Sequence, residues 1–144
     1  MITPDDVLSR WFGPLDSPDY PQPQPKLWWG KNPETDDALR EEFGEALASV
    51  GTGELDFWRQ TPRGTLALII LIDQLSRNLH RDTPQMYALD DLAQILVLHA
   101  LIDHLDGALL PHERAFLYMP LMHAESASLQ RLCLECFHRL AEEA

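Results

Sequence analysis

The sequence predicts an all-α fold of about six helices, and three observations support this prediction. Helix-start signals recur in which a capping residue precedes proline, at Thr3-Pro4, Asn32-Pro33 and Thr61-Pro62. The apolar residues that follow recur every three or four positions, as one face of a helix requires. Alternating polar and apolar residues, the pattern of a half-buried strand, are nearly absent. We expect one domain over residues 1–144, with its helices packed as antiparallel pairs.

The first helix is expected to begin at Pro4 and to end at Gly13. A proline-rich loop follows, and we expect it to run extended over the surface, because proline lacks an N–H donor and breaks helices. Its prolines are Pro14, Pro18, Pro21, Pro23 and Pro25. The next helix is expected to begin at Pro33, to carry an apolar stripe at residues 39, 43, 46, 47 and 50, and to end at Gly51.

A third helix is expected to begin at Pro62 and to lie in the middle of the fold. Its segment Leu66–Ile72 is apolar on every side, which is typical of a helix buried all round. A buried strand could have the same composition, but the cap at Thr61 and the helical spacing of later polar residues favour a helix. This run of seven residues is far too short to span a bilayer.

Three further helices are expected in the second half of the chain. The first runs from about Pro84 to Leu105, the next from His112 until Pro120 stops it, and the last reaches Leu140. The apolar face of the last helix consists of Leu129, Leu132, Cys133, Cys136, Phe137 and Leu140. Six acidic residues and no Lys or Arg occur from position 82 to 113, and we expect a solvated surface there.

Charge and composition exclude several partners. The chain has 11 Lys and Arg against 23 Asp and Glu, a formal net charge of −12. Nucleic acids and anionic membranes bind positive surfaces, so neither is an expected partner. The N-terminal residues lack the basic and apolar regions of a signal peptide, which predicts a cytoplasmic protein.

A dense polar cluster ends the central helix. It consists of Asp73, Gln74, Arg77, Asn78 and Arg81, spaced so that Asp73 faces Arg77 and Gln74 faces Asn78. Several of these groups should be partly buried, and Asp90 is the expected partner because it lies on the apolar side of the next helix. One interpretation is an Asp–Arg network that docks two helices. The other is an arginine-lined pocket for a carboxylate or phosphate.

A second polar cluster contains Tyr118, His123 and Glu125. His123 could act as a general base, oriented by Glu125 or Asp73 if the fold brings them together. The alternative is a structural histidine with satisfied hydrogen bonds. On one continuous helix, His123 would share a face with Ser126 and Gln130.

His123-Ala124-Glu125 followed by Cys133 and Cys136 resembles the H-x-E…C-x-x-C signature of zinc deaminases. That fold requires strands, and both cysteines lie on an apolar helix face, so we expect core thiols, no metal and no cofactor. All four tryptophans precede position 59. Trp11 and the pair Trp28-Trp29 flank the proline-rich loop and are expected to anchor it to the helices, or alternatively to form the aromatic wall of a pocket.

Several runs of residues together resemble the bacterial DUF924 family, a domain of unknown function. The runs are Trp11-Phe12-Gly13, Trp28-Trp29-Gly30-Lys31, Asp73-Gln74 with Arg77-Asn78, and Phe116 to Glu125. The resemblance implies a tetratricopeptide-like helical superhelix and no assigned activity. Longer members continue into an F-G-R-x-P-x-R-N segment that this sequence lacks, so we expect exposed apolar surface and self-association into a homodimer.

These observations lead to three hypotheses. The first is a helical binding or scaffold domain whose polar Asp/Arg/His/Glu site recognises a small anion or a peptide carboxylate. The second is a hydrolase with His123 as general base and Arg77 or Arg81 neutralising a developing anion. In the third, the polar clusters only hold the fold together and the protein is an assembly partner.

Overall fold

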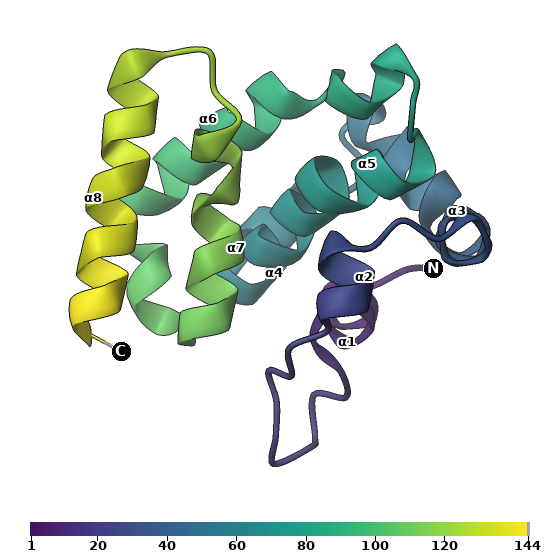
Figure 1. The fold of residues 1–144 in the computed structure, drawn as a ribbon, viewed down its shortest axis with the longest axis horizontal. Helices are drawn as coiled ribbons and strands as arrows, with labels where there is room; N and C mark the ends of the chain where they lie inside the picture. The colour runs from purple at the N-terminus through teal and green to yellow at the C-terminus, as the bar shows by residue number, and fades with distance from the viewer. Residues whose placement is uncertain (144) are drawn as a thin grey trace.

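The computed structural model describes residues 1–143, and within that range every regular element is helical, which confirms the all-α prediction (Figure 1). The α-helices are α1 (Pro4–Phe12), α2 (Pro25–Trp29), α3 (Pro33–Ser49), α4 (Pro62–Ile69), α5 (Ser76–Leu79), α6 (Asp90–Ile102), α7 (Pro111–Met122) and α8 (Ala127–Glu143). Helices α7 and α8 form an antiparallel pair at one end of the molecule, while α1–α3 lie at the other. The tetratricopeptide-like arrangement stays a prediction.

The three helix starts predicted from capping residues are confirmed. The Thr3 hydroxyl accepts a hydrogen bond from the Asp6 N–H, and Asn32 caps the start of α3 through its Oδ1. The Thr61 hydroxyl accepts from the Gly64 N–H at 2.9 Å. Each cap satisfies backbone N–H groups that have no partner inside the helix, which fixes where the helix begins.

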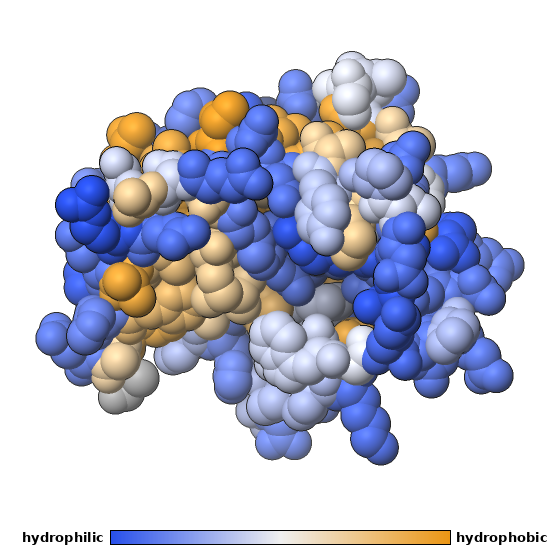
Figure 2. All heavy atoms as spheres, turned by 45° about the horizontal axis from the view of Figure 1, so that its top comes forward, coloured by the Kyte–Doolittle hydropathy of each residue, from blue (hydrophilic) through white to orange (hydrophobic). Residues whose placement is uncertain are grey.

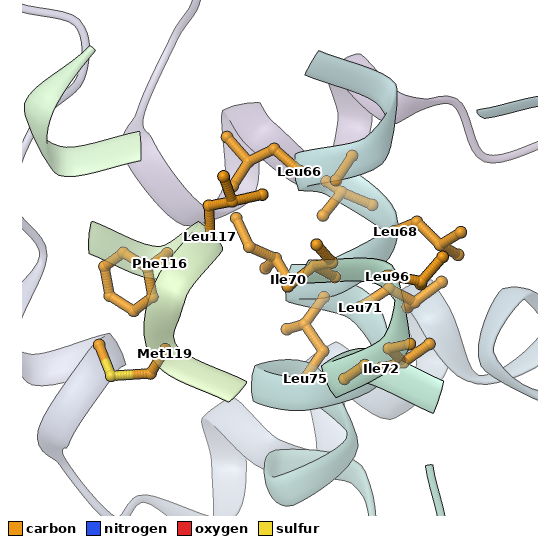
Figure 3. Packing of buried hydrophobic residues seen from close by; sticks show 14 of the residues in the cluster. Leu66, Leu68, Ile70, Leu71, Ile72, Leu75, Leu96, Phe116, Leu117 and Met119 are labelled. Atoms are coloured by element: carbon orange, nitrogen blue, oxygen red, sulfur yellow. The ribbon is translucent and has the colours of Figure 1, made fainter. Parts of the chain in front are cut away.

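The central helix is confirmed as the buried axis of the fold, and it contains a π-helical segment. Helices α4 and α5 form one continuous rod through the π-helical residues Ile70–Leu75, where the Ser76 N–H bonds to the Leu71 carbonyl five residues back. Every residue of this segment is buried. Figure 3 shows the rod packed between Leu96 of α6 and Leu117 of α7.

Gly64 marks the closest approach in the core, because an added Cβ would lie 2.0 Å from the Trp58 carbonyl oxygen. We expect Gly64→Ala to lower the free energy of unfolding by about 1–3 kcal/mol, since the backbone of the preceding turn must move. Gly44→Ala is the matched control. A Cβ added there would lie 3.9 Å from Arg40 Cγ, an ordinary contact. The higher helix propensity of alanine should then raise the free energy of unfolding by about 0.5–1 kcal/mol. Urea denaturation measures both changes, and equal effects would contradict the clash.

Three expected boundaries were wrong. Helix α7 continues through Pro120 to Met122. The missing N–H is tolerated there because only the last turn is affected. The segment expected to be helical from Pro84 is a short 3₁₀ turn, and α6 begins only at Asp90. Pro25, expected within an extended loop, instead opens the short helix α2, because proline suits the first helical position.

The tryptophans anchor the proline-rich loop as expected. The Trp28 Nε1 donates to the Trp11 carbonyl at 2.9 Å, and the Trp28 ring lies 4.7 Å from that of Phe116, centroid to centroid. Within the loop, the Tyr20 hydroxyl donates to Glu113 at 2.8 Å. The loop is therefore held against α7, and the helix that follows it is held against α1.

The acidic run was expected to be solvated, and this is wrong for Glu113. Its side chain is 1% exposed, bonds to the Leu110 N–H at 2.9 Å and pairs with Arg63 at 3.1 Å. A buried carboxylate needs such partners, because leaving it unpaired is costly. The acidic run contains no Lys or Arg, so the side-chain partners of Glu113 come from α4 (Arg63) and the proline-rich loop (Tyr20).

On the face shown in Figure 2, polar side chains surround smaller groups of apolar ones. Trp29, Ile102 and Leu134 are among the large apolar side chains that solvent reaches. Within residues 1–143, no helix has the length and apolar character needed to cross a membrane.

Candidate functional site

A pocket of about 450 Å³ brings together most of the polar residues singled out in the sequence. It lies where α2, the end of the central helix and the end of α7 meet. The pocket is lined by Trp28, Trp29, Gly30, Gln74, Arg77, Asn78, Arg81, Met86, Met119, Met122 and His123. The first predicted cluster and His123 of the second, which lies 50 residues after Asp73 in sequence, therefore converge on one space.

The carboxylate of Asp73 lies beneath this pocket and is fully buried. It accepts hydrogen bonds from Gln74 Nε2 at 2.8 Å and from Arg77 Nη1 at 3.4 Å. Its Oδ1 lies 3.0 Å from Nδ1 of His123. Both oxygens of this buried carboxylate therefore have a hydrogen-bonding partner within the protein.

Asp73 and Gln74 both lie in the π-helical segment. In an α-helix, Asp73 and Gln74 would point about 100° apart. Here both side chains are buried and joined by a direct hydrogen bond. Wider turns of this kind occur often at functional sites. The sequence does not indicate this segment, because its apolar residues fit an ordinary α-helix equally well.

Arg77 joins the central helix to α6, as the docking-network interpretation predicted. Its Nη1 and Nη2 each donate to one carboxylate oxygen of Asp90 at 3.2 Å, and Nη1 also reaches the Asp73 carbonyl. The Tyr87 ring lies 5.7 Å from the guanidinium carbon. Among the described residues, nothing accepts a hydrogen bond from Arg77 Nε, so the edge formed by Nε and Nη2 stays free for a ligand.

Arg81 is fixed in the complementary way by Asp36 of α3. Its Nε and Nη2 donate to the two Asp36 oxygens at 2.6 and 3.2 Å, and Asn78 donates to the same carboxylate at 3.0 Å. Burial alone would raise the pKa of Asp36, but the hydrogen bonds from Arg81 and Asn78 outweigh it and lower that pKa. Nothing in the described part of the chain accepts from Arg81 Nη1, so its outer edge stays free.

His123 follows the last residue of α7 and lines the pocket. The expectation that it shares a helix face with Ser126 and Gln130 was wrong, because α7 ends at Met122 and α8 begins at Ala127. Gln130 instead donates to the Ala124 carbonyl and closes the connecting turn. Of the two carboxylates considered for orienting His123, the one in contact is Asp73.

Tyr118 and Glu125 lie outside this pocket. The Tyr118 hydroxyl donates to Asp106 and accepts from Arg114, and its ring packs against Phe137 of α8. Burial and the hydrogen bond to Asp106 raise the pKa of Tyr118 to about 12. Glu125 is exposed in the turn before α8. Neither Tyr118 nor Glu125 therefore lines the pocket.

Cys133 and Cys136 are core thiols, as predicted. Both are buried where α8 packs against α7, and burial raises the pKa of each thiol. A thiol with a raised pKa is a poor nucleophile and a poor metal ligand at neutral pH.

Several pocket residues were not identified as a site from the sequence. Asp36, which holds Arg81 beside the pocket, lies 45 positions before it, and no residue near Asp36 in the sequence indicates this pairing. Met86, Met119 and Met122 gave no signal, because methionine on a helix usually indicates core. The aromatic wall was considered as an alternative role for the tryptophans, and Trp28 and Trp29 line the pocket while also anchoring the loop.

The fold and the pocket together describe a small all-helical domain with a polar cleft built on a π-containing central helix. Residues 7–144 match the model of the family described as "Bacterial protein of unknown function (DUF924)", so the chain belongs to the DUF924 family. A solved protein of unknown function from Agrobacterium tumefaciens, ATU0120, is similar to this chain. It is 28% identical, with a TM-score of 0.79, over 96% of this chain and 78% of that one. No curated protein matches.

Proposed function

We propose that this domain binds a small molecule or peptide end that carries one carboxylate, held by Arg77 and Arg81 in the pocket that His123 borders. The observation that carries the proposal is the pair of free arginine edges in one pocket. Each guanidinium gives one edge to an internal aspartate and keeps a second edge free of protein partners. Such an edge matches the geometry of a carboxylate.

The internal aspartates prepare these arginines for binding. Asp90 and Asp36 hold the guanidinium planes in place, with side-chain exposures of only 20% and 24% for Arg77 and Arg81. A fixed side chain loses little rotamer entropy when a ligand arrives, and that loss otherwise costs about 0.5–1.5 kcal/mol per side chain. The same two arginines can therefore join the helices and also bind a ligand.

The charge of the site favours a single negative charge on the ligand. Two arginines face three aspartates around the pocket (Asp36, Asp73 and Asp90), which leaves a net charge of −1 when His123 is neutral. A dianionic phosphate would add two more negative charges at close range. A monoanionic carboxylate adds one negative charge instead of two and is the better match.

The other wall of the pocket supports an apolar part on the same ligand. Trp29 stacks on Phe116 at 6.1 Å between centroids and is 65% exposed, so its outer ring face is open. Met86, Met119 and Met122 complete this wall. Methionine adapts its shape and contacts aromatic rings favourably, which suits an aromatic or branched apolar group.

Titration calorimetry with benzoate and with phenyl phosphate tests this function. We expect saturable binding of benzoate, weaker binding of phenyl phosphate, and at least about tenfold weaker benzoate binding in Arg81→Lys, because lysine lacks the two-donor edge. Arg131→Lys, on the exposed face of α8, is the matched control and should bind as the wild type does. Absence of saturable binding by both probes would favour the purely structural alternative.

A further inference from the structure

The His123 imidazole has the features of a positioned general base. Its Nδ1 lies 3.0 Å from an Asp73 carboxylate that is itself fully buried and held by Gln74 and Arg77. A carboxylate in this position holds the proton on Nδ1 and fixes the ring orientation. The other ring nitrogen, Nε2, then carries the lone pair.

Nε2 is free and accessible. Within residues 1–143 it takes part in no hydrogen bond, and it is absent from the buried unpaired atoms, which are the indole nitrogens of Trp11 and Trp58. A purely structural histidine would be expected to use both nitrogens. Here one is committed to Asp73, while the ring, with a side chain 26% exposed, borders the pocket.

The rest of the pocket lining determines which nucleophile this base can serve. None of the residues that form it is a serine, threonine, cysteine or lysine. The lining therefore offers no hydroxyl, thiol or amine nucleophile, and water is the nucleophile left for a base to activate. Arg77 and Arg81 supply the donors that an oxyanion requires.

We propose that the pocket hydrolyses esters or amides of small carboxylate-bearing molecules, with His123 as the catalytic base and Asp73 as its positioning residue. This inference rests on the proposed function, since the substrate's carboxylate occupies one arginine edge. Water loses a proton to Nε2 as its oxygen bonds to the acyl carbon, and the carbonyl oxygen becomes an oxyanion beside the other arginine. The oxyanion then re-forms the carbonyl, the bond to the leaving group breaks, and that group takes the proton from Nε2.

The test measures release of 4-nitrophenol from its monoester with succinic acid, which carries a free carboxylate, and from 4-nitrophenyl acetate, which does not. We expect turnover of the succinate ester to exceed that of the acetate. His123→Asn should lower kcat/KM by about 10²–10⁴-fold, because its amide can still donate to Asp73 but offers no base. Imidazole added to the buffer should restore part of that loss.

Two further variants separate chemistry from folding. His138→Asn, at an exposed position of α8, is the matched control and should keep the wild-type rate. Asp73→Asn should lower kcat with little change in KM, because it misorients the base without removing the arginines. Thermal melting of each variant shows whether it is folded, so that a rate loss in a folded His123→Asn protein reports on chemistry.

The outcomes distinguish the two proposals. Saturable benzoate binding with no hydrolysis of the succinate ester overturns the hydrolase and leaves the binding function intact. Equal rates for wild type and His123→Asn, or no rescue by imidazole, also overturn it. If the folded wild-type protein neither binds benzoate nor hydrolyses the succinate ester, both proposals are contradicted.

Discussion

Replacing Arg77 by methionine is expected to lower the free energy of unfolding by about 3–5 kcal/mol, a large fraction of what a domain of this size possesses. Arg77 neutralises Asp73, which is fully buried, and Asp90, whose side chain is 17% exposed. Methionine preserves the apolar stem but leaves both carboxylates without their cation. The cost is that of leaving buried charge unpaired, and it exceeds the net value of the ion pair itself.

Urea denaturation at neutral pH measures this effect, with Lys31→Met as the matched control. Lys31 pairs with Asp82 at 3.4 Å, but both side chains are mostly exposed, so its loss should change stability by less than about 1 kcal/mol. In the double variant Arg77→Met with Asp90→Leu, part of the lost stability should return, because one stranded carboxylate is gone. Equal effects of Arg77→Met and Lys31→Met would contradict a buried network.

Replacing Phe116 by alanine is expected to cost about 3–5 kcal/mol of stability and also to weaken the pocket. The Phe116 ring lies 5.7 Å from the rings of both Trp11 and Phe12, and 4.7 Å from that of Trp28. The cavity left behind would remove support from α2, which carries the tryptophans of the pocket wall. Benzoate affinity should therefore fall together with stability.

Phe57→Ala is the control for this second substitution. Phe57 is 53% exposed, so its truncation creates no cavity and should cost less than about 1 kcal/mol. Phe116→Leu, which keeps most of the volume, should fall between the two. Denaturation followed by tryptophan fluorescence gives the stability change, and calorimetry with benzoate gives the binding change. Loss of stability without loss of binding would show that the wall does not depend on Phe116.

Local chemistry in the sequence was enough to predict the helices and the buried axis. The caps at Thr3, Asn32 and Thr61 bond to N–H groups no more than three residues away. The apolar stretch that begins at Leu66 predicts a buried helix, because it has no polar face. The partnership of Arg77 with Asp90 was also predictable, because both positions lie on faces that the helical period turns inward. Caps and helical periodicity depend only on residues that are close together in the sequence.

The predictions failed where contacts span long stretches of chain. Asp36 and Arg81 meet because α3 packs against α5, and nothing near either residue specifies that packing. The sequence around Glu113 is typical of a surface acid, because its partners Tyr20 and Arg63 reach it only through tertiary structure. Pairings of this kind depend on how helices dock, which helical periodicity does not encode.

The π-helical segment has a consequence for how this fold tolerates change in length. A turn of this kind holds one residue more than an α-helical turn, so it sets the apolar half of the central helix out of phase with the polar half. Deleting one residue between Ile70 and Leu75 would restore the ordinary period and leave both α4 and the pocket arginines in their present orientation. If the same residues instead formed an uninterrupted α-helix at unchanged length, Arg77 and Arg81 would be rotated by about 100° about the helix axis. The hydrophobic core and the pocket are therefore brought into register by a single residue.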